Sequence, residues 1–103
     1  MRREYFRVFS DLDRIRCLFD CVRGRILEFV VQYELRHQEH WFPVVRYDTS
    51  HGIVHRDVSA PDGSVVKSWF PGMSFDEGLR LGYNDIVSNW EKYRSRFYAE
   101  LGS

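Results

Sequence analysis

The chain has 103 residues, and its 15 basic and 15 acidic residues give a formal net charge of zero. This length allows one domain with one core, residues 1–103, and an apolar share of 44% with 17% aromatic residues excludes the disordered class. The balanced charge excludes a global positive field, so any contact with nucleic acid needs a local basic patch.

A short predicted strand and an ambiguous stretch open the chain. Residues 4–9, EYFRVF, are rich in strand-forming residues and alternate weakly, which predicts a first strand. In residues 10–24 the apolar residues recur at helical spacing between a cap at Ser10 and a stop at Gly24, and we favour a helix there. A strand is the alternative, because alternate residues also share one face: Ile15, Cys17, Phe19 and Cys21.

A clearer strand pattern follows in residues 25–36, RILEFVVQYELR. One face carries only apolar residues: Leu27, Phe29, Val31, Tyr33 and Leu35. The other face carries Glu28, Gln32 and Glu34. This alternation predicts a long strand that is buried on one side.

Three further strands are separated by short turns. WFPVVRYD (41–48) leads through the turn TSHG to IVHRDVS (53–59), and APDG then precedes SVVKSWF (64–70). Such short links predict antiparallel pairing in sequence order, a β-meander over residues 25–70. Trp69 and Phe70 are expected to pack in the core or against a helix.

A long helix is predicted over residues 74–100. Ser74 and Glu77 fit a capping box, and one helical stripe carries Leu79, Tyr83, Ile86, Trp90, Tyr93 and Phe97. The helix would be about 39 Å long against about 20 Å for a strand, so it must overhang or kink, with Gly78 and Gly82 as weak points. An overhanging aromatic stripe predicts a homodimer. The fold class is α+β, an antiparallel meander of four to five strands with this helix packed on one face.

The chain is expected to be cytoplasmic. It has no apolar run of signal-peptide length at its start, and none anywhere approaches the roughly 20 residues of a membrane span. Cys17 and Cys21 are expected to be buried, reduced thiols. No P-loop, Rossmann or H-E-x-x-H motif occurs, and no cofactor or membrane partner is expected.

The stretch VVRYDTSHGIVHRD, residues 44–57, concentrates two histidines, two arginines and two aspartates around a turn. A four-residue turn closed by Gly52 would place Arg46 directly opposite His55, with Asp48 beside it and Asp57 on the diagonal. The other face would be the core side, with Arg56 as its misfit: Val45, Tyr47, Val54 and Val58.

Acid–base chemistry on a phosphodiester is one use of this hairpin. His55 would exchange protons, Asp48 or Asp57 would orient it, and Arg46 would hold the phosphate. His51, in the turn, completes the predicted catalytic set.

Three other interpretations stay open. A metal site would use His51, His55 and Asp57. A binding surface for RNA or a partner protein would add four residues around the same turn: Trp41, Tyr47, Arg56 and Asp57. A purely structural hairpin would use the same polar groups as cross-strand pairs.

The stretch WFPVVRYDTSHGIVHRD, followed by PDG and a helix containing NWEKYRSRF, resembles a family of small uncharacterised prokaryotic proteins with a PVVRYDxxHGxxHRD core. Arg46, Tyr47, Asp48, Gly52 and His55 are also similar to a motif of small toxin components of toxin-antitoxin pairs. The second resemblance implies action on RNA and an antitoxin-like partner protein. Whether the chain is an enzyme or a non-catalytic module that dimerises through its helix is left open.

Overall fold

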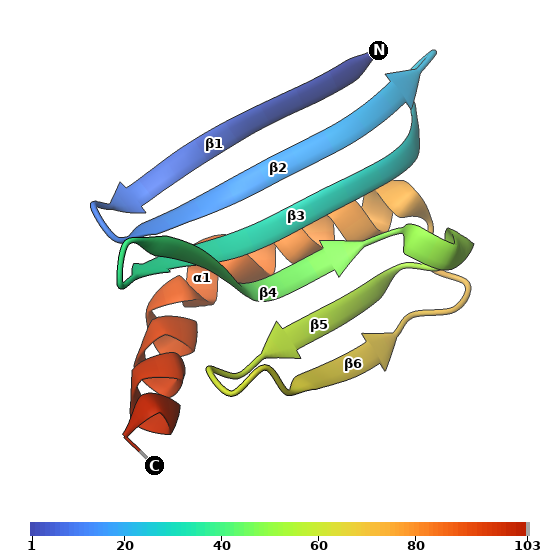
Figure 1. The fold of residues 1–103 in the computed structure, drawn as a ribbon. Helices are drawn as coiled ribbons and strands as arrows, with labels where there is room; N and C mark the ends of the chain where they lie inside the picture. The colour runs from blue at the N-terminus through green and yellow to red at the C-terminus, as the bar shows by residue number, and fades with distance from the viewer. Residues whose placement is uncertain (103) are drawn as a thin grey trace.

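The computed structural model describes residues 1–102 and has two layers, an antiparallel sheet and one α-helix. The elements in chain order are β1 (Arg2–Ser10), β2 (Asp13–Val22), β3 (Arg25–His37), β4 (His40–Asp48), η1 (Ser50–Gly52), β5 (His55–Ser59), β6 (Val65–Trp69) and α1 (Phe75–Leu101). The strands lie in the order β1-β2-β3-β4-β5-β6, and α1 covers one face while the opposite, open face carries no helix (Figure 1). The predicted α+β meander with a carboxy-terminal helix is confirmed, with six strands in place of four to five.

The helix favoured for residues 10–24 is wrong, because this segment forms β2. β2 pairs with β1 on one edge and β3 on the other, so its backbone donors and acceptors are satisfied in the sheet. Ile15 and Cys17 turn inward and are fully buried. Gly24, at φ 76°, closes a hairpin rather than a helix.

The core lies between the middle strands and α1, and its β3 residues are those of the predicted face. Phe29, Val31, Tyr33 and Leu35 are at most 2% exposed. Leu27 departs from the prediction at 52% exposure, whereas Phe29, two residues on, is buried beside Gly78 of α1. Cys17 is buried and Cys21 half-buried, and both are free thiols.

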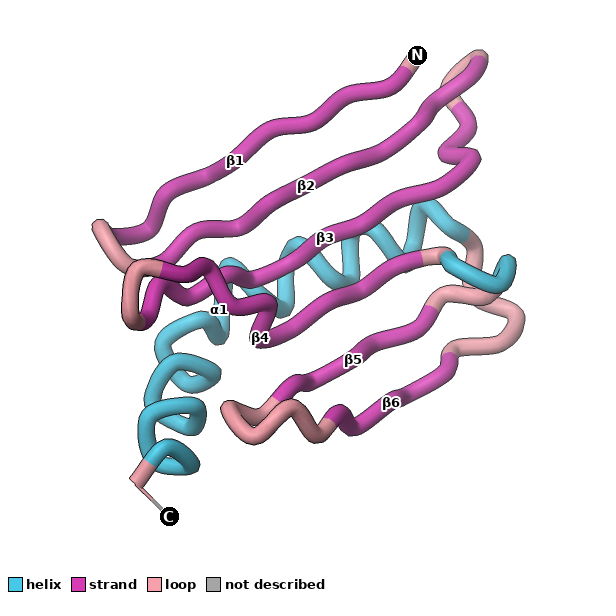
Figure 2. Tube along the Cα trace, in the orientation of Figure 1, coloured by secondary structure: helices cyan, strands magenta, loops and turns pink. Residues whose placement is uncertain are grey.

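The amino terminus of α1 has the predicted cap. Ser74 Oγ accepts from the backbone N–H of Glu77 at 3.2 Å and contacts the Glu77 carboxylate at 2.9 Å. The helix is continuous over 27 residues and changes direction near its middle (Figure 2). The bend comes after Gly78 and Gly82, both of which are buried against the sheet, so the glycines permit close packing and do not form the predicted weak points.

The aromatic stripe of α1 does not overhang. Ile86 and Phe97 are buried, and the Trp90 ring stacks on Phe9 with centroids 5.1 Å apart. The surface on which the expected helix-mediated dimer depended is therefore used within the chain, and dimerisation stays a prediction. Within residues 1–102, no helix combines the length and apolar character needed to cross a membrane.

Candidate functional site

The hairpin of β4 and β5 differs in register from the prediction. Asp48 pairs with His55 and Arg46 with Asp57, so six residues rather than four connect the strands. The loop is longer because η1 turns the chain through His51, at φ 68°, and because Val54 is drawn into the core at 0% exposure. A shift of two residues preserves the face of every side chain, since strand side chains alternate with period two.

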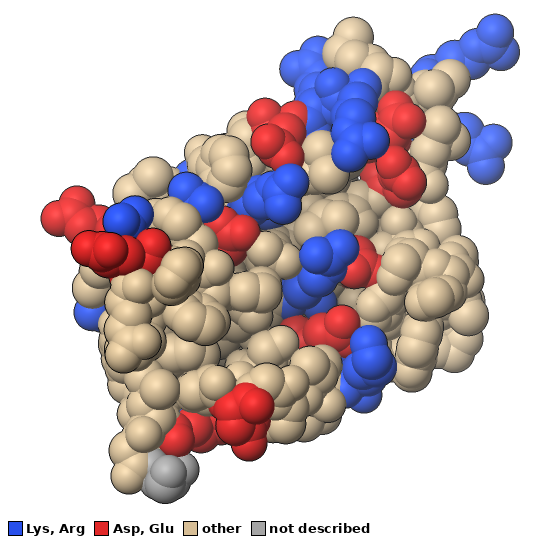
Figure 3. Space-filling view, in the orientation of Figure 1, with Lys and Arg blue, Asp and Glu red and all other residues tan. Residues whose placement is uncertain are grey.

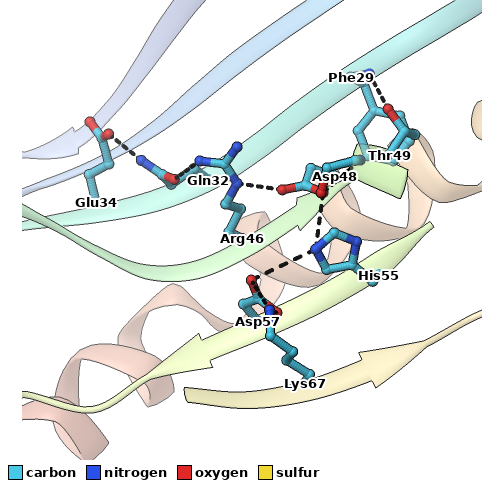
Figure 4. Close-up of polar contacts among 10 residues, drawn as sticks. Phe29, Gln32, Glu34, Arg46, Asp48, Thr49, His55, Asp57 and Lys67 are labelled. Carbon is cyan, nitrogen blue, oxygen red and sulfur yellow. Dashed lines mark hydrogen bonds and ion pairs between the residues drawn. The ribbon is translucent and has the colours of Figure 1, made fainter. Parts of the chain in front are cut away.

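Arg46, Asp48, His55 and Asp57 therefore share the open face, as predicted, but the opposed pair is Asp48 and His55 (Figure 4). His55 Nε2 lies 3.1 Å from Asp48 Oδ1 and 3.8 Å from Asp57 Oδ2. The residues of the main pair are only 4% and 3% exposed, although α1 lies on the other side of the sheet. The site is thus a buried carboxylate–imidazole pair.

Asp48 is stabilised as a carboxylate by donors on three sides. Arg46 Nε lies 2.5 Å from Oδ2, while the Ser50 backbone N–H and hydroxyl donate to Oδ1 at 3.0 and 2.9 Å. Burial alone would raise the pKa of Asp48, but the hydrogen bonds from Arg46 and Ser50 outweigh it and hold the pKa below its ordinary value. Asp48 is therefore charged at neutral pH and can orient His55.

Asp48 belongs to a chain of polar contacts that crosses the open face, here called the polar ladder (Figure 4). Its members, in order across the sheet, are Arg14, Glu34, Gln32, Arg46, Asp48, His55, Asp57 and Lys67. Gln32 joins its two halves, donating to Glu34 at 2.6 Å and accepting from Arg46 at 3.3 Å. Sequence reasoning did not select Gln32 or Lys67 as site residues, although the alternation of residues 25–36 places Gln32 on the polar face.

His55 has one nitrogen in the ladder and one without a partner. Nδ1 is buried and makes no hydrogen bond within residues 1–102. The Trp69 ring packs against the imidazole with centroids 4.8 Å apart, and the His51 ring lies 6.5 Å away. Trp69 is 48% exposed, so the expectation that it packs in the core or on the helix is wrong, whereas Phe70 does pack on Tyr47.

The other predicted hairpin residues lie elsewhere. Tyr47 and Arg56 face α1, where the Tyr47 hydroxyl donates to Asp85 at 2.6 Å and Arg56 donates to the Tyr93 hydroxyl at 2.8 Å. Burial, together with the hydrogen bond to Asp85, raises the pKa of Tyr47. These two residues join the helix to the sheet, which explains why the charged Arg56 lies on the core side of the hairpin.

Trp41 is also separate from the pair. It lies near the start of β4, seven residues before Asp48, and its ring is covered by the Arg14 guanidinium at 3.9 Å. At about 3.3 Å per strand residue, this places Trp41 about 23 Å from the hairpin end.

The surroundings of the pair offer a hollow for a small group. Among residues 1–102, no three His, Cys, Asp or Glu side chains are arranged to hold a metal ion.

Beside Asp48 lies a hollow of about 330 Å³, with Arg2, Arg46 and Ser50 among the polar residues of its lining and Leu18 and Val30 among the apolar ones. Its size and mixed lining suit a small, partly apolar group such as a nucleobase.

Comparison with protein families gives one match. A family described as "Domain of unknown function (DUF7718)" matches residues 1–103. Comparisons with curated proteins and with solved structures gave no match.

Proposed function

The chain belongs to the DUF7718 family, whose function is unknown, and we propose that it is a toxin-like protein that cleaves RNA by acid–base catalysis. The observation that carries the proposal is the environment of His55. Its Nε2 faces a charged, buried carboxylate, while its Nδ1 is buried without a partner among the described residues. A carboxylate that fixes one imidazole nitrogen leaves the other to take or give a proton.

The proposed reaction uses two histidines. The 2′-hydroxyl of RNA gives its proton to His55 Nδ1, and its oxygen attacks the adjacent phosphorus. The bond from phosphorus to the 5′-oxygen breaks, and protonated His51 supplies the proton to the leaving oxygen. The products are a 2′,3′-cyclic phosphate and a free 5′-hydroxyl, and proton exchange with water restores both imidazoles. The His51 and His55 ring centroids lie 6.5 Å apart, which brings both imidazoles within reach of one phosphodiester once Trp69 has moved.

Arg46 and Trp69 have supporting roles in this scheme. Arg46 is 41% exposed and has guanidinium donors beyond those that contact Asp48 and Gln32, which suits it to the phosphate. Trp69 packs against His55 at a tilt of 35° and is half-exposed on the edge strand β6, so a nucleobase can compete for its place and uncover the imidazole.

The test is cleavage of RNA in the absence of divalent metal. His51→Ala and His55→Ala should each reduce the rate by about 100-fold to 10,000-fold. His40→Ala is the matched control, because His40 is an exposed residue at the start of β4, the end of the strand away from the hairpin. DNA of the same sequence should remain intact, since it lacks the attacking 2′-hydroxyl.

His51 keeps the test informative if His55→Ala unfolds, because His51 is exposed and its replacement leaves the core unchanged. The proposal fails if the wild type leaves RNA intact with and without metal. It also fails if His51→Ala cleaves RNA at the wild-type rate.

A non-catalytic interaction module is the second candidate, and the edge strand β1 favours it. Tyr5, Phe6 and Val8 are 43%, 45% and 69% exposed on β1, which among the described residues pairs only with β2. Exposed apolar residues on a free edge suit strand pairing with a second copy or with a partner protein. Sedimentation equilibrium of wild type and of Val8→Lys discriminates: a dimer that the lysine disrupts supports this candidate.

A further inference from the structure

One end of the sheet carries most of the unneutralised charge of its strands. The β1–β2 register places Arg2 opposite Asp20 and Arg3 opposite Phe19, beside the turn that joins β2 to β3. Arg23 lies in this turn and Arg25 follows it, so four arginines from two distant segments meet there. We call Arg2, Arg3, Arg23 and Arg25 the basic tip. Figure 3 shows Lys and Arg side chains gathered at this end of the sheet and projecting from it.

The basic tip is poorly neutralised. Within residues 1–102, Arg23 and Arg25 form no ion pair and no side-chain hydrogen bond. Arg2 has only a 3.9 Å contact with Glu28, and both side chains are more than 60% exposed. Four arginines and the amino-terminal ammonium face two carboxylates, Asp20 and Glu28, which gives a local net charge of +3; Asp20 lies 3.3 Å from the ammonium and is already paired.

The open face beside the tip is different, because most of its cations are paired; Arg36, at the far end of β3, instead lies over the Trp41 ring at 5.7 Å. Arg14, Arg16, Arg46 and Lys67 each contact a carboxylate within 3.2 Å. The electrostatic attraction of the sheet for an anion is therefore concentrated at the tip, where exposed charges steer a polyanion without first breaking an ion pair.

We infer that the basic tip binds the phosphate backbone of RNA and leads the strand to the Asp48–His55 pair. Its cations are all arginine, whose planar guanidinium binds phosphate through paired donors. The tip bears no Trp or Tyr, the residues that anchor proteins at a lipid surface. Arg2 belongs to the tip and also lines the hollow beside Arg46 and Asp48, so the two surfaces are continuous. The choice of RNA rests on the proposed function, whereas phosphate binding at the tip does not require cleavage.

The test measures binding of a fluorescent, uncleavable 2′-O-methyl RNA by anisotropy at several salt concentrations. The tip variant combines Arg23→Asn and Arg25→Thr, because asparagine tolerates the φ of 52° at position 23 and threonine suits a strand. It should bind roughly tenfold more weakly, and the slope of log K against log salt should fall by about 1.4 for two lost phosphate contacts. The control combines Arg36→Gln and Arg80→Gln, which removes the same charge from exposed positions outside the tip and should leave binding and slope unchanged.

Three results would overturn the inference: equal binding by wild type and tip variant, equal weakening by tip and control variants, or binding only to phosphatidylserine vesicles. Failure of the proposed function looks different. If wild type binds RNA through the basic tip but does not cleave it, the inference about RNA binding is supported and the proposed cleavage activity is rejected. If the tip variant cleaves RNA with an unchanged KM, the proposed cleavage activity is supported and an RNA-binding role of the basic tip is excluded.

Discussion

Asp48→Asn tests the polar ladder at its most connected residue. The carboxylate accepts from Arg46 at 2.5 Å and from Ser50 at 2.9 and 3.0 Å, and it faces His55 at 3.1 Å. An amide has one acceptor oxygen and two N–H donors, so it must present a donor to either Arg46 or Ser50. A lost hydrogen bond to a charged group costs roughly 1.5–3 kcal/mol, and the partial exposure of Arg46 places the expected loss at about 2 kcal/mol.

The assay is urea denaturation at pH 7, with Asp57→Asn as the matched control. Asp57 lies on the same face, but its contacts are weaker: Lys67, at 3.2 Å, is 53% exposed, and His55 is 3.8 Å away, so the control should lose less than about 1 kcal/mol of unfolding free energy. The reasoning is refuted if Asp48→Asn lies within about 0.5 kcal/mol of wild type, the range of an ordinary surface change.

Wild type and Asp48→Asn should also differ in how their stability depends on pH. A carboxylate with a lowered pKa stabilises the fold above its unfolded pKa and loses that contribution as the pH falls through its folded pKa. Wild type should therefore lose stability below about pH 4, and the loss should be smaller in Asp48→Asn, which has no proton to bind at that position. Equal pH dependence in the two proteins would contradict the assignment.

Two further predictions concern the contact of α1 with the sheet. Gly82→Ala should lower the free energy of unfolding by about 1–2 kcal/mol, because a Cβ there would lie 2.8 Å from the Tyr47 ring; Gly102→Ala, with its nearest atom at 3.7 Å, should show little change in the same thermal denaturation experiment. Asp85→Asn should let Tyr47 and Tyr93 ionise at lower pH, because Asp85 contributes to the raised pKa of both; phenolate absorbance measures this shift, and an unchanged titration would exclude the contact.

The hairpin shows how far local pattern extends. Alternation along the two strands predicts that Arg46, Asp48, His55 and Asp57 share one face, and the strand pairing confirms it. Alternation could not supply the register, because a shift of two residues changes every cross-strand partner and leaves every face unchanged. Core packing set the register of the β4–β5 hairpin, because the burial of Val54 lengthens the loop.

The ambiguous segment, residues 10–24, shows the opposite case. Its apolar residues fit helical and strand periods, and only pairing on both edges of β2 selects the strand. The position of Trp69 also depends on strand pairing. Trp69 pairs with His55 across the β5–β6 ladder, and its neighbours in sequence do not specify this contact.

The sequence by itself determined the class of fold, the capped helix, the buried face of β3 and the polar side of the hairpin, because each depends on the periodicity of neighbouring residues. Tertiary structure alone decided that Asp48 rather than Arg46 faces His55, that Gln32 joins the polar ladder, and that four arginines from two segments form the basic tip. Those outcomes depend on the strand register and on core packing, which bring together residues far apart in the chain.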